Sequence, residues 1–216
     1  MIEEPELRKI ILVRHGTTDW VEQQILHGIT DISLNKMGLA QAGKAAKALT
    51  DSGAQKIYSS SLTRCVQTAN AIGNQLNREP VLMDSLVELD FGWLEGRHFR
   101  DHDKGEFGKL TEFFDSQIFN LIRMLSGEPK QKFMARILAG WNRILNENSE
   151  GTVIVVGHSG VFSRILQYLF GEEYLKKGDS YYHLNPCSIT EIQINDDNHM
   201  ELIRLNDRSH LSEKNR

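Results

Sequence analysis

Short apolar runs alternate with longer stretches of helical spacing along most of the chain. Four runs have the length and composition of buried or half-buried strands: 10–13, 55–59, 80–83 and 152–156. Apolar residues recur at helical spacing in four further stretches: 39–49, 62–76, 133–145 and 161–170. Two last segments alternate with period two, which predicts a closing antiparallel pair: 187–194 and 200–205. This order predicts an α/β fold, a three-layer α/β/α sandwich with a mostly parallel, mixed sheet.

Residues that form helix caps set the expected helix boundaries. Asn35 precedes the first helix as its N-cap, and Gly53 is expected to close that helix at the C′ position. Ser60 and Ser61 are the expected N-caps of the next helix. The segment 17–31 is polar and is expected to form a loop between the first strand and the first helix.

Residues 97 to about 127 differ in character from the rest of the chain. The segment 97–109 is dense in charge, whereas 110–125 carries apolar side chains at the spacing of an amphipathic helix. We therefore expect a helical insertion that covers one end of the sheet as a lid. A length of 216 residues then fits one domain spanning residues 1–216 and carrying this insertion.

Composition excludes several classes of function. The net charge of −4 gives no basic field for nucleic acid, and no apolar run reaches the roughly 20 residues that span a bilayer. The first nine residues are acidic and polar rather than a secretory signal, so we expect a cytoplasmic protein without a membrane partner. Cys65 and Cys187 have no paired spacing, which predicts two reduced thiols in the core.

Polar side chains follow the predicted buried strands. Arg14 and His15 come directly after the first strand, and His158 follows the strand at 152–156. Arg64 lies in the first turn of a helix, where free N–H groups and the helix dipole favour an anion. Two arginines and two imidazoles at one sheet edge repel one another unless an anion lies between them. Phosphate is the anion that arginine binds bidentately, so the sequence predicts a phosphate site.

These residues belong to a series of motifs that resembles the histidine phosphatase superfamily, with its phosphoglycerate-mutase-like fold. In chain order the motifs are Arg14-His15-Gly16, the arginine motif at 60–69, the acid loop at 86–96, Gly157-His158-Ser159-Gly160 and Ser188-Ile189-Thr190. The resemblance extends from about residue 10 to residue 207. No Arg-x-Pro follows the first triplet, which makes the chain similar to the mutase-related branch rather than to the acid phosphatases and phytases.

The resemblance implies a phosphatase that works through a covalent intermediate. His15 would be the nucleophile and would form a phosphohistidine. Arg14, Arg64 and His158 would bind the phosphoryl oxygens, over which negative charge spreads in the transition state. No metal ion or other cofactor is expected, because the arginines supply the positive charge.

The resemblance also assigns an acid and several substrate contacts. Glu88 would protonate the leaving oxygen and then accept a proton from the attacking water, with Asp90 and Glu95 as competing carboxylates in the same loop. Four further residues would contact the substrate: Thr18, His27, Gly28 and Ser159.

Two departures from the family pattern bear on the substrate and the reaction. Val21 stands where the family usually has an asparagine that contacts the phosphate, and His27 stands where the family has glutamine or threonine. The mutases of the superfamily resemble one another in carrying an adjacent arginine pair in the insertion, and residues 97–127 contain none. We therefore expect hydrolysis of a small phosphorylated metabolite, with inorganic phosphate as a product, rather than phosphoryl transfer between substrates or action on a phosphoprotein.

Three other classes of protein stay open on the sequence. A serine hydrolase would use Ser159 in a nucleophile elbow, but Val161 stands where that motif needs glycine. A metal phosphohydrolase would use four residues of the charged segment: His98, Asp101, His102 and Asp103. A module that binds phosphate without turnover would keep the same pocket, and the loss of the asparagine at Val21 is consistent with it.

Overall fold

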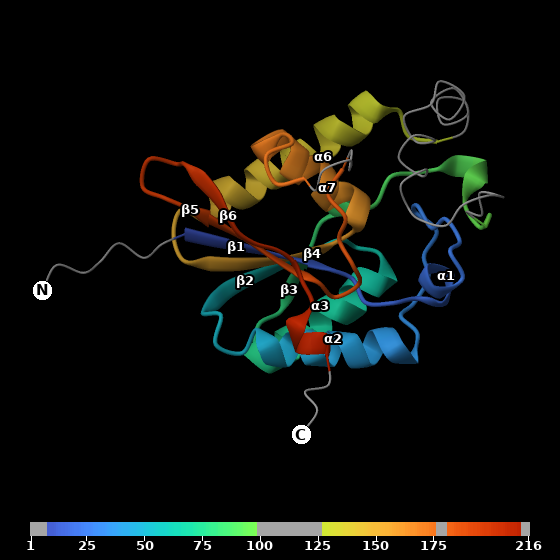
Figure 1. Cartoon of the computed structure of the whole chain (residues 1–216), viewed down its shortest axis with the longest axis horizontal. Coiled ribbons are helices and arrows are strands. Elements are labelled where there is room, and N and C mark those ends of the chain that lie inside the picture. The colour runs from blue at the N-terminus through green and yellow to red at the C-terminus, as the bar shows by residue number, and fades with distance from the viewer. Residues whose placement is uncertain (1–7, 99–126, 176–180, 213–216) are drawn as a thin grey trace, which may run out of the picture.

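The computed structural model describes residues 8–98, 127–175 and 181–212, and six strands form one mixed sheet in the described part of the chain. The strands follow the spatial order β3-β2-β4-β1-β5-β6 (Figure 1). Their bounds are β1 Arg8–Arg14, β2 Ala54–Ser59, β3 Pro80–Leu82, β4 Thr152–Gly157, β5 Ile189–Ile194 and β6 Met200–Asp207. Strands β1 to β4 pair in parallel, and β5 and β6 complete one side of the sheet in antiparallel pairs.

Helices cover both faces of this sheet. The longer ones are α2 Lys36–Ala48, α3 Thr63–Leu76, α6 Lys130–Glu147 and α7 Ser159–Phe170. In Figure 1, α2 and α3 lie below the sheet and α6 and α7 lie above it, which gives the three predicted layers. The short elements are α1 Asp19–Glu22 and the 3₁₀ turns η1 Asp84–Leu86, η2 Gly92–Leu94 and η3 Ser209–Leu211. The mixed α/β fold predicted from the sequence is confirmed.

Strand β1 shows why the sheet has two cores. Its consecutive side chains point to opposite faces, as the period of a strand requires. Ile10 and Leu12 join the cluster formed with α6 and α7, which includes the fully buried Trp141. Ile11 and Val13 join the cluster formed with α2 and α3. A strand covered on both faces is a continuous apolar run, which is the pattern seen in the sequence.

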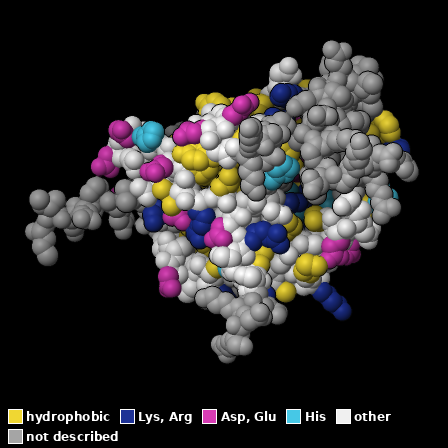
Figure 2. Space-filling model, viewed as in Figure 1, with side chains coloured by type: hydrophobic (Ala, Val, Ile, Leu, Met, Phe, Trp, Pro, Cys, Tyr) yellow, Lys and Arg dark blue, Asp and Glu magenta, His cyan; other side chains and the backbone are white. Residues whose placement is uncertain are grey.

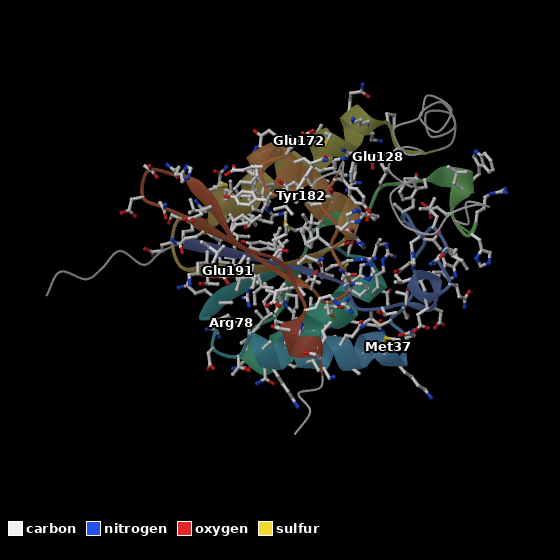
Figure 3. All side chains as sticks on the ribbon, in the orientation of Figure 1. Met37, Arg78, Glu128, Glu172, Tyr182 and Glu191 are labelled. Carbon is white, nitrogen blue, oxygen red and sulfur yellow. The ribbon has the colours of Figure 1, made fainter. Side chains whose placement is uncertain are left out.

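Charged side chains stabilise the antiparallel side of the sheet and lie scattered over the surface. Glu191 of β5, labelled in Figure 3, lies on this side of the sheet. It pairs with Arg204 of β6 at 2.9 Å and with Lys9 of β1 at 3.6 Å. Figure 2 shows acidic and basic side chains mixed over one face of the molecule. Among the described residues, no helix is both long enough and apolar enough to cross a bilayer.

Helix caps are where the sequence prediction and the structure differ most. Asn35 caps α2 as predicted, because its side chain accepts a hydrogen bond from the Gly38 N–H at 2.9 Å. Gly53 is not the C′ residue: α2 ends at Ala48, and Gly53 (φ +68°) lies in the turn that leads into β2.

The cap of α3 comes from a distant residue. Ser60 and Ser61 precede its N-cap residue, Leu62, whose side chain makes no cap bond. The carboxylate of Asp31 instead accepts from the Thr63 N–H at 2.7 Å and from the Thr63 hydroxyl at 2.6 Å. The expectation that the N–H groups at this helix start are free for an anion is therefore wrong for Thr63.

Three other sequence predictions concern the segment 17–31, Leu39 and the lid helix at 110–125. The segment 17–31 is not wholly a loop, because it contains α1. Leu39 shares the apolar spacing of α2, yet 51% of it is exposed. The predicted lid helix at 110–125 lies outside the described residues.

Candidate active site

The parallel pairing of β1 and β4 brings the two motif histidines together. Arg14 is in register with Gly157 at the carboxyl ends of these neighbouring strands, so His15 and His158 leave the sheet at the same edge. Their rings meet edge to face with centroids 5.2 Å apart. His15 is 4% exposed and His158 is fully buried. The sequence predicted this meeting from strand ends alone.

The imidazole of His15 is held with one nitrogen free to react. Its Nδ1 lies 2.8 Å from the carbonyl oxygen of Gly16. A carbonyl only accepts hydrogen bonds, so this contact puts the proton on Nδ1 and leaves a lone pair on Nε2. Burial and the charges of Arg64 and Arg14 lower the pKa of His15 well below its ordinary value. His15 is therefore a neutral, oriented imidazole at physiological pH.

His158 shares this electrostatic environment. Burial, followed by the charges of Arg64 and Arg14, lowers its pKa well below the ordinary value. The Ser60 hydroxyl lies 2.8 Å from its Nε2, and the Cys65 sulfur lies 3.4 Å from the same nitrogen. Burial raises the pKa of Cys65 to about 12, so the group beside His158 is a neutral thiol. Cys65 and Cys187 are both free and buried, as predicted.

Two arginines approach this pair of histidines without a carboxylate partner. Arg64 is fully buried, and its guanidinium donates to the carbonyls of Thr30 at 2.9 Å and Gly28 at 2.7 Å. Arg14 donates to the Leu184 carbonyl at 2.6 Å. The Nε of each arginine is buried without a hydrogen-bond partner, and neither side chain forms an ion pair with a described residue. Burial lowers the pKa of both arginines, as desolvation of a cation does.

Unpaired buried guanidinium groups point to an anionic ligand. A buried charge without a partner costs several kcal/mol, so proteins rarely keep one without a functional reason. Two such groups beside two neutral imidazoles leave a cluster with more positive than negative charge. A phosphoryl group supplies both the missing charge and acceptor oxygens in the geometry that guanidinium groups fit.

Glu88 faces the same region from the acid loop. Its Oε1 accepts from the Leu89 N–H at 2.9 Å, and its Oε2 accepts from the Gly160 N–H in the first turn of α7 at 3.0 Å. Its negative charge raises the pKa of both Arg14 and Arg64, so the carboxylate is electrostatically coupled to the arginines. A Cβ on Gly160 would lie 2.5 Å from Glu88 Oε1, which explains the glycine there.

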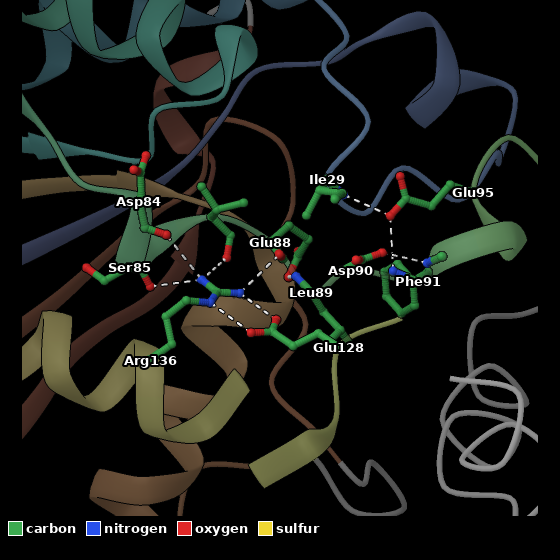
Figure 4. Close-up of polar contacts among 12 residues, drawn as sticks. Ile29, Asp84, Ser85, Glu88, Leu89, Asp90, Phe91, Glu95, Glu128 and Arg136 are labelled. Carbon is green, nitrogen blue, oxygen red and sulfur yellow. Dashed lines mark hydrogen bonds and ion pairs between the residues drawn. The ribbon is translucent and has the colours of Figure 1, made fainter. Parts of the chain in front are cut away.

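The two competing carboxylates are occupied elsewhere. Glu95 accepts hydrogen bonds from the Ile29 N–H at 2.9 Å and the Phe91 N–H at 3.0 Å (Figure 4). It also accepts from the Thr30 N–H at 2.8 Å and from the Thr30 hydroxyl. Asp90 accepts from the Gly92 N–H at 2.6 Å. Glu88 is also held by two N–H groups, but of these three carboxylates it is the one whose charge acts on both Arg14 and Arg64, which makes it the candidate acid.

The predicted substrate contacts are engaged within the protein. The Thr18 hydroxyl accepts from the Val21 N–H at 3.1 Å and lies 2.5 Å from His27 Nε2. Burial lowers the pKa of His27 to about 3, so its ring is neutral. Gly28 (φ +53°) uses its carbonyl to hold Arg64. Gly28 therefore supports the arginine, Thr18 and His27 contact each other, and Ser159 lies beside His158 as the first residue of α7.

Sequence reasoning missed Asp31, the structural role of Glu95, and Arg136. Arg136 of α6 binds the main chain of the acid loop together with Glu128 (Figure 4). These residues contact backbone groups far away in the sequence, so no local spacing marks them. The glycines and acidic residues of the acid loop were the only signal that the loop needed external support.

The predicted metal ligands are not assembled by the described residues. Only His98 of that set is described, and its Nδ1 lies 3.1 Å from the Gln23 carbonyl. No group of three or more histidine, cysteine or acidic side chains suited to a metal ion occurs within 8–98, 127–175 and 181–212. Asp101, His102 and Asp103 lie outside these ranges.

A sheet edge that delivers two neutral histidines and two unpaired arginines defines a protein that handles a phosphoryl group. Residues 10–208 match the model of the histidine phosphatase superfamily (branch 1), so the chain belongs to that superfamily, as its motifs predicted.

Similar proteins include phosphatases and mutases. A metal-independent phosphoserine phosphatase of Arabidopsis thaliana is 31% identical over 164 residues, which cover 75% of this chain and 68% of that relative. A mutant phosphoserine phosphatase from Entamoeba histolytica, solved in complex with phosphoserine, has a TM-score of 0.75 at 24% identity, covering 95% of this chain and 100% of that one. The phosphoglycerate mutase from Bacillus anthracis has a TM-score of 0.76 at 21% identity, covering 96% of each chain.

Proposed function

We propose that this protein is a metal-independent phosphomonoester hydrolase that works through a phosphohistidine on His15. The observation that carries the proposal is the pair of buried guanidinium groups, Arg14 and Arg64, without a carboxylate partner beside an imidazole whose Nε2 is unprotonated. The arginines supply the positive charge that other phosphatases draw from metal ions. The neutral imidazole supplies the nucleophile.

The first step transfers the phosphoryl group to the enzyme. The lone pair on His15 Nε2 attacks phosphorus, and the bond from phosphorus to the ester oxygen breaks. Glu88, protonated at this stage, gives its proton to the leaving oxygen, so the product leaves as an alcohol. Arg14, Arg64 and an N–H of His158 bind the phosphoryl oxygens as they spread into the transition state.

The second step returns the enzyme to its starting state. Glu88, now a carboxylate, takes a proton from a water molecule as the water oxygen attacks the phosphohistidine. The bond from phosphorus to Nε2 breaks, which releases inorganic phosphate and restores the lone pair. Nδ1 of His15 keeps its proton and its hydrogen bond to the Gly16 carbonyl throughout, so the ring needs no tautomer change.

The substrate is proposed to be a small phosphorylated metabolite. Phosphoserine is the first compound to try, because a relative at 31% identity is named a phosphoserine phosphatase and a structural neighbour was solved with phosphoserine. The absence of an adjacent arginine pair from 97–127 favours hydrolysis over transfer between two substrates. We propose that the protein acts in the cytoplasm, without nucleic acid or membrane partners.

The test is hydrolysis of p-nitrophenyl phosphate and phosphoserine, with and without EDTA, by the native chain and by His15→Ala. We expect EDTA to leave the rate unchanged and His15→Ala to lose at least about 10³-fold, since a nucleophile has no substitute. His199→Ala, at an exposed histidine in the turn between β5 and β6, is the control and should keep the native rate.

Three results would count against the proposal. Loss of activity in EDTA would favour a metal mechanism, and full activity of His15→Ala would remove the nucleophile. An inactive native chain whose fold is still protected against heat by inorganic phosphate would be the non-catalytic binding module.

A further inference from the structure

The guanidinium group of Arg136 gathers the main chain of the acid loop onto α6. Its Nη1 donates to the carbonyls of Val87 at 2.7 Å and Ser85 at 3.1 Å, and reaches that of Asp84 at 3.4 Å. Its Nη2 reaches the carbonyl of Glu88 at 3.3 Å. Figure 4 shows these carbonyls converging on the one guanidinium group. The segment 84–88 is thus held through its backbone, whatever side chains it carries.

Glu128 fixes the orientation of Arg136. Its two carboxylate oxygens accept from Nε at 3.0 Å and from Nη2 at 2.7 Å, which is the bidentate geometry of a strong pair. The side chains of Arg136 and Glu128 are 23% and 9% exposed, so water screens the pair weakly. The Glu128 N–H also donates to the Asp90 carbonyl at 2.9 Å, which joins the far end of the acid loop to the same unit.

Close packing supports the same connection. A Cβ on Gly140, one helical turn from Arg136, would lie 2.3 Å from the Ser85 hydroxyl. Helix α6 therefore packs tightly against the Ser85 side chain of η1. Leu86 is fully buried beside this contact. The acid loop therefore rests directly on α6.

Glu88 is consequently held at two points by two different helices. Its carboxylate binds the Gly160 N–H of α7, while its backbone carbonyl is bound by Arg136 of α6. A proton donor must lie within hydrogen-bond reach of the leaving oxygen, and misplacement by about 1 Å costs on the order of 100-fold in rate. Fixing the backbone of Glu88 restricts where its carboxyl group can reach.

We propose that Arg136, oriented by Glu128, is a positioning residue that holds Glu88 where it can protonate the leaving group. This inference rests on the proposed hydrolase activity and on Glu88 as the acid. It separates the positioning of the acid from the binding of the phosphoryl group, which depends on Arg14, Arg64 and His158. Loss of Arg136 should therefore harm proton transfer much more than phosphate binding.

The test compares two leaving groups with different needs for a proton. An alkyl phosphate such as phosphoserine needs protonation of its leaving oxygen, whereas the anion of 2,4-dinitrophenyl phosphate leaves without it. We compare kcat/KM, because it reports formation of the phosphohistidine and excludes the later attack of water, which also uses Glu88. In Arg136→Gln we expect kcat/KM for phosphoserine, or for the best alkyl phosphate found, to fall about 10- to 100-fold. The kcat/KM for 2,4-dinitrophenyl phosphate, and inhibition by inorganic phosphate, should change by less than about threefold.

Arg143→Gln is the matched control. Arg143 lies two turns along the same helix and pairs with Glu147 on an exposed surface, so this variant removes a similar ion pair without touching the acid loop. It should keep both rates. Glu128→Gln and Arg136→Lys should show the same selective loss in a milder form, because each keeps part of the hydrogen-bond set.

The outcomes separate this inference from the proposed function. If the native chain hydrolyses neither compound, the hydrolase proposal itself fails. If the native chain is active and Arg136→Gln loses both rates equally, or neither, the positioning role is wrong and Arg136 is a structural tether. If Arg136→Gln does not fold, Glu128→Gln tests the positioning role by the same comparison of phosphoserine with 2,4-dinitrophenyl phosphate.

Discussion

The reactive nitrogen of His15 is defined by a contact on the opposite side of the ring. Nδ1 of His15 donates a hydrogen bond to the Gly16 carbonyl oxygen, 2.8 Å away. The charges of Arg64 and Arg14 disfavour a second proton on the ring. Orientation and protonation state are therefore fixed before any substrate arrives. Such preorganisation removes a cost that would otherwise be added to the barrier of the chemical step.

This arrangement predicts a specific NMR signature for His15. Two-bond ¹H–¹⁵N correlation spectra of the substrate-free protein should show the Nδ1–H tautomer, with no titration between pH 7.5 and pH 5.5. The physical reason is that burial and the charges of Arg64 and Arg14 lower its pKa well below 6.5. A midpoint near 6.5 for His15 would contradict the proposed protonation state.

At the scale of elements, the loop that carries His15 packs directly on the N-terminal turn of α2. A Cβ on Gly38 would lie 2.0 Å from the Thr17 carbonyl oxygen, and one on Gly16 would lie 2.6 Å from the Gly38 carbonyl oxygen. Both neighbours are backbone atoms, which cannot rotate away. The absence of two side chains therefore allows the loop to turn toward the active site.

Two glycine substitutions in α2 should have opposite effects. We expect Gly38→Ala to lower the free energy of unfolding by about 1–3 kcal/mol, because the loop at Thr17 must move to admit the new methyl group. Gly43→Ala in the same helix meets nothing within 4 Å and should raise it by about 0.5–1 kcal/mol. Urea unfolding of both variants measures the difference. Equal effects in the two would show that the close contact at Gly38 is relaxed in solution.

The elements also mark how far the sequence alone could lead. Some features depend on neighbours within a few residues, so their sequence patterns predict them. They are the β-branched run of β4, the alternation of β5 and the Asn35 cap. Asp31 caps α3 from 32 residues away, and Arg136 reaches carbonyls 48 to 52 residues earlier. Asp31 and Arg136 bind backbone groups, which nearly every residue carries. The type of the partner residue therefore gives no sign of these contacts. The meeting of Arg14, His15, Arg64 and His158 at one sheet edge could be predicted, whereas the residues that support them could not.

At the scale of the whole molecule, the site contains several buried histidines that stay uncharged at mildly acidic pH only because the chain is folded. His15, His27 and His158 all have pKa values lowered by burial and by the arginines. In the unfolded chain each would return to an ordinary value near 6.5. At mildly acidic pH these histidines therefore bind protons in the unfolded chain but not in the folded chain.

Stability should consequently fall as the pH is lowered from 7.5 to 5.5. The contribution of these histidines is fully present above about pH 6.5 and is lost below it, by at most about 1.4 kcal/mol per pH unit for each histidine. Urea unfolding at several pH values measures the slope. His27→Gln should reduce it by about one third, whatever that substitution does to stability at pH 7.5. A slope of zero between pH 6.5 and pH 5.5 would contradict the lowered pKa values.

The position of β1 has a consequence for how the protein is made. Lys9 pairs with Thr152 on one side and with Gln193 on the other, so β1 waits for two strands that are synthesised long after it. Contacts between such distant residues close slowly, because the loop entropy must be overcome before the pairing stabilises anything. His15 leaves the ribosome well before His158 and meets it only when β4 has emerged. A nascent chain should therefore lack the proposed phosphatase activity until β4 has been synthesised.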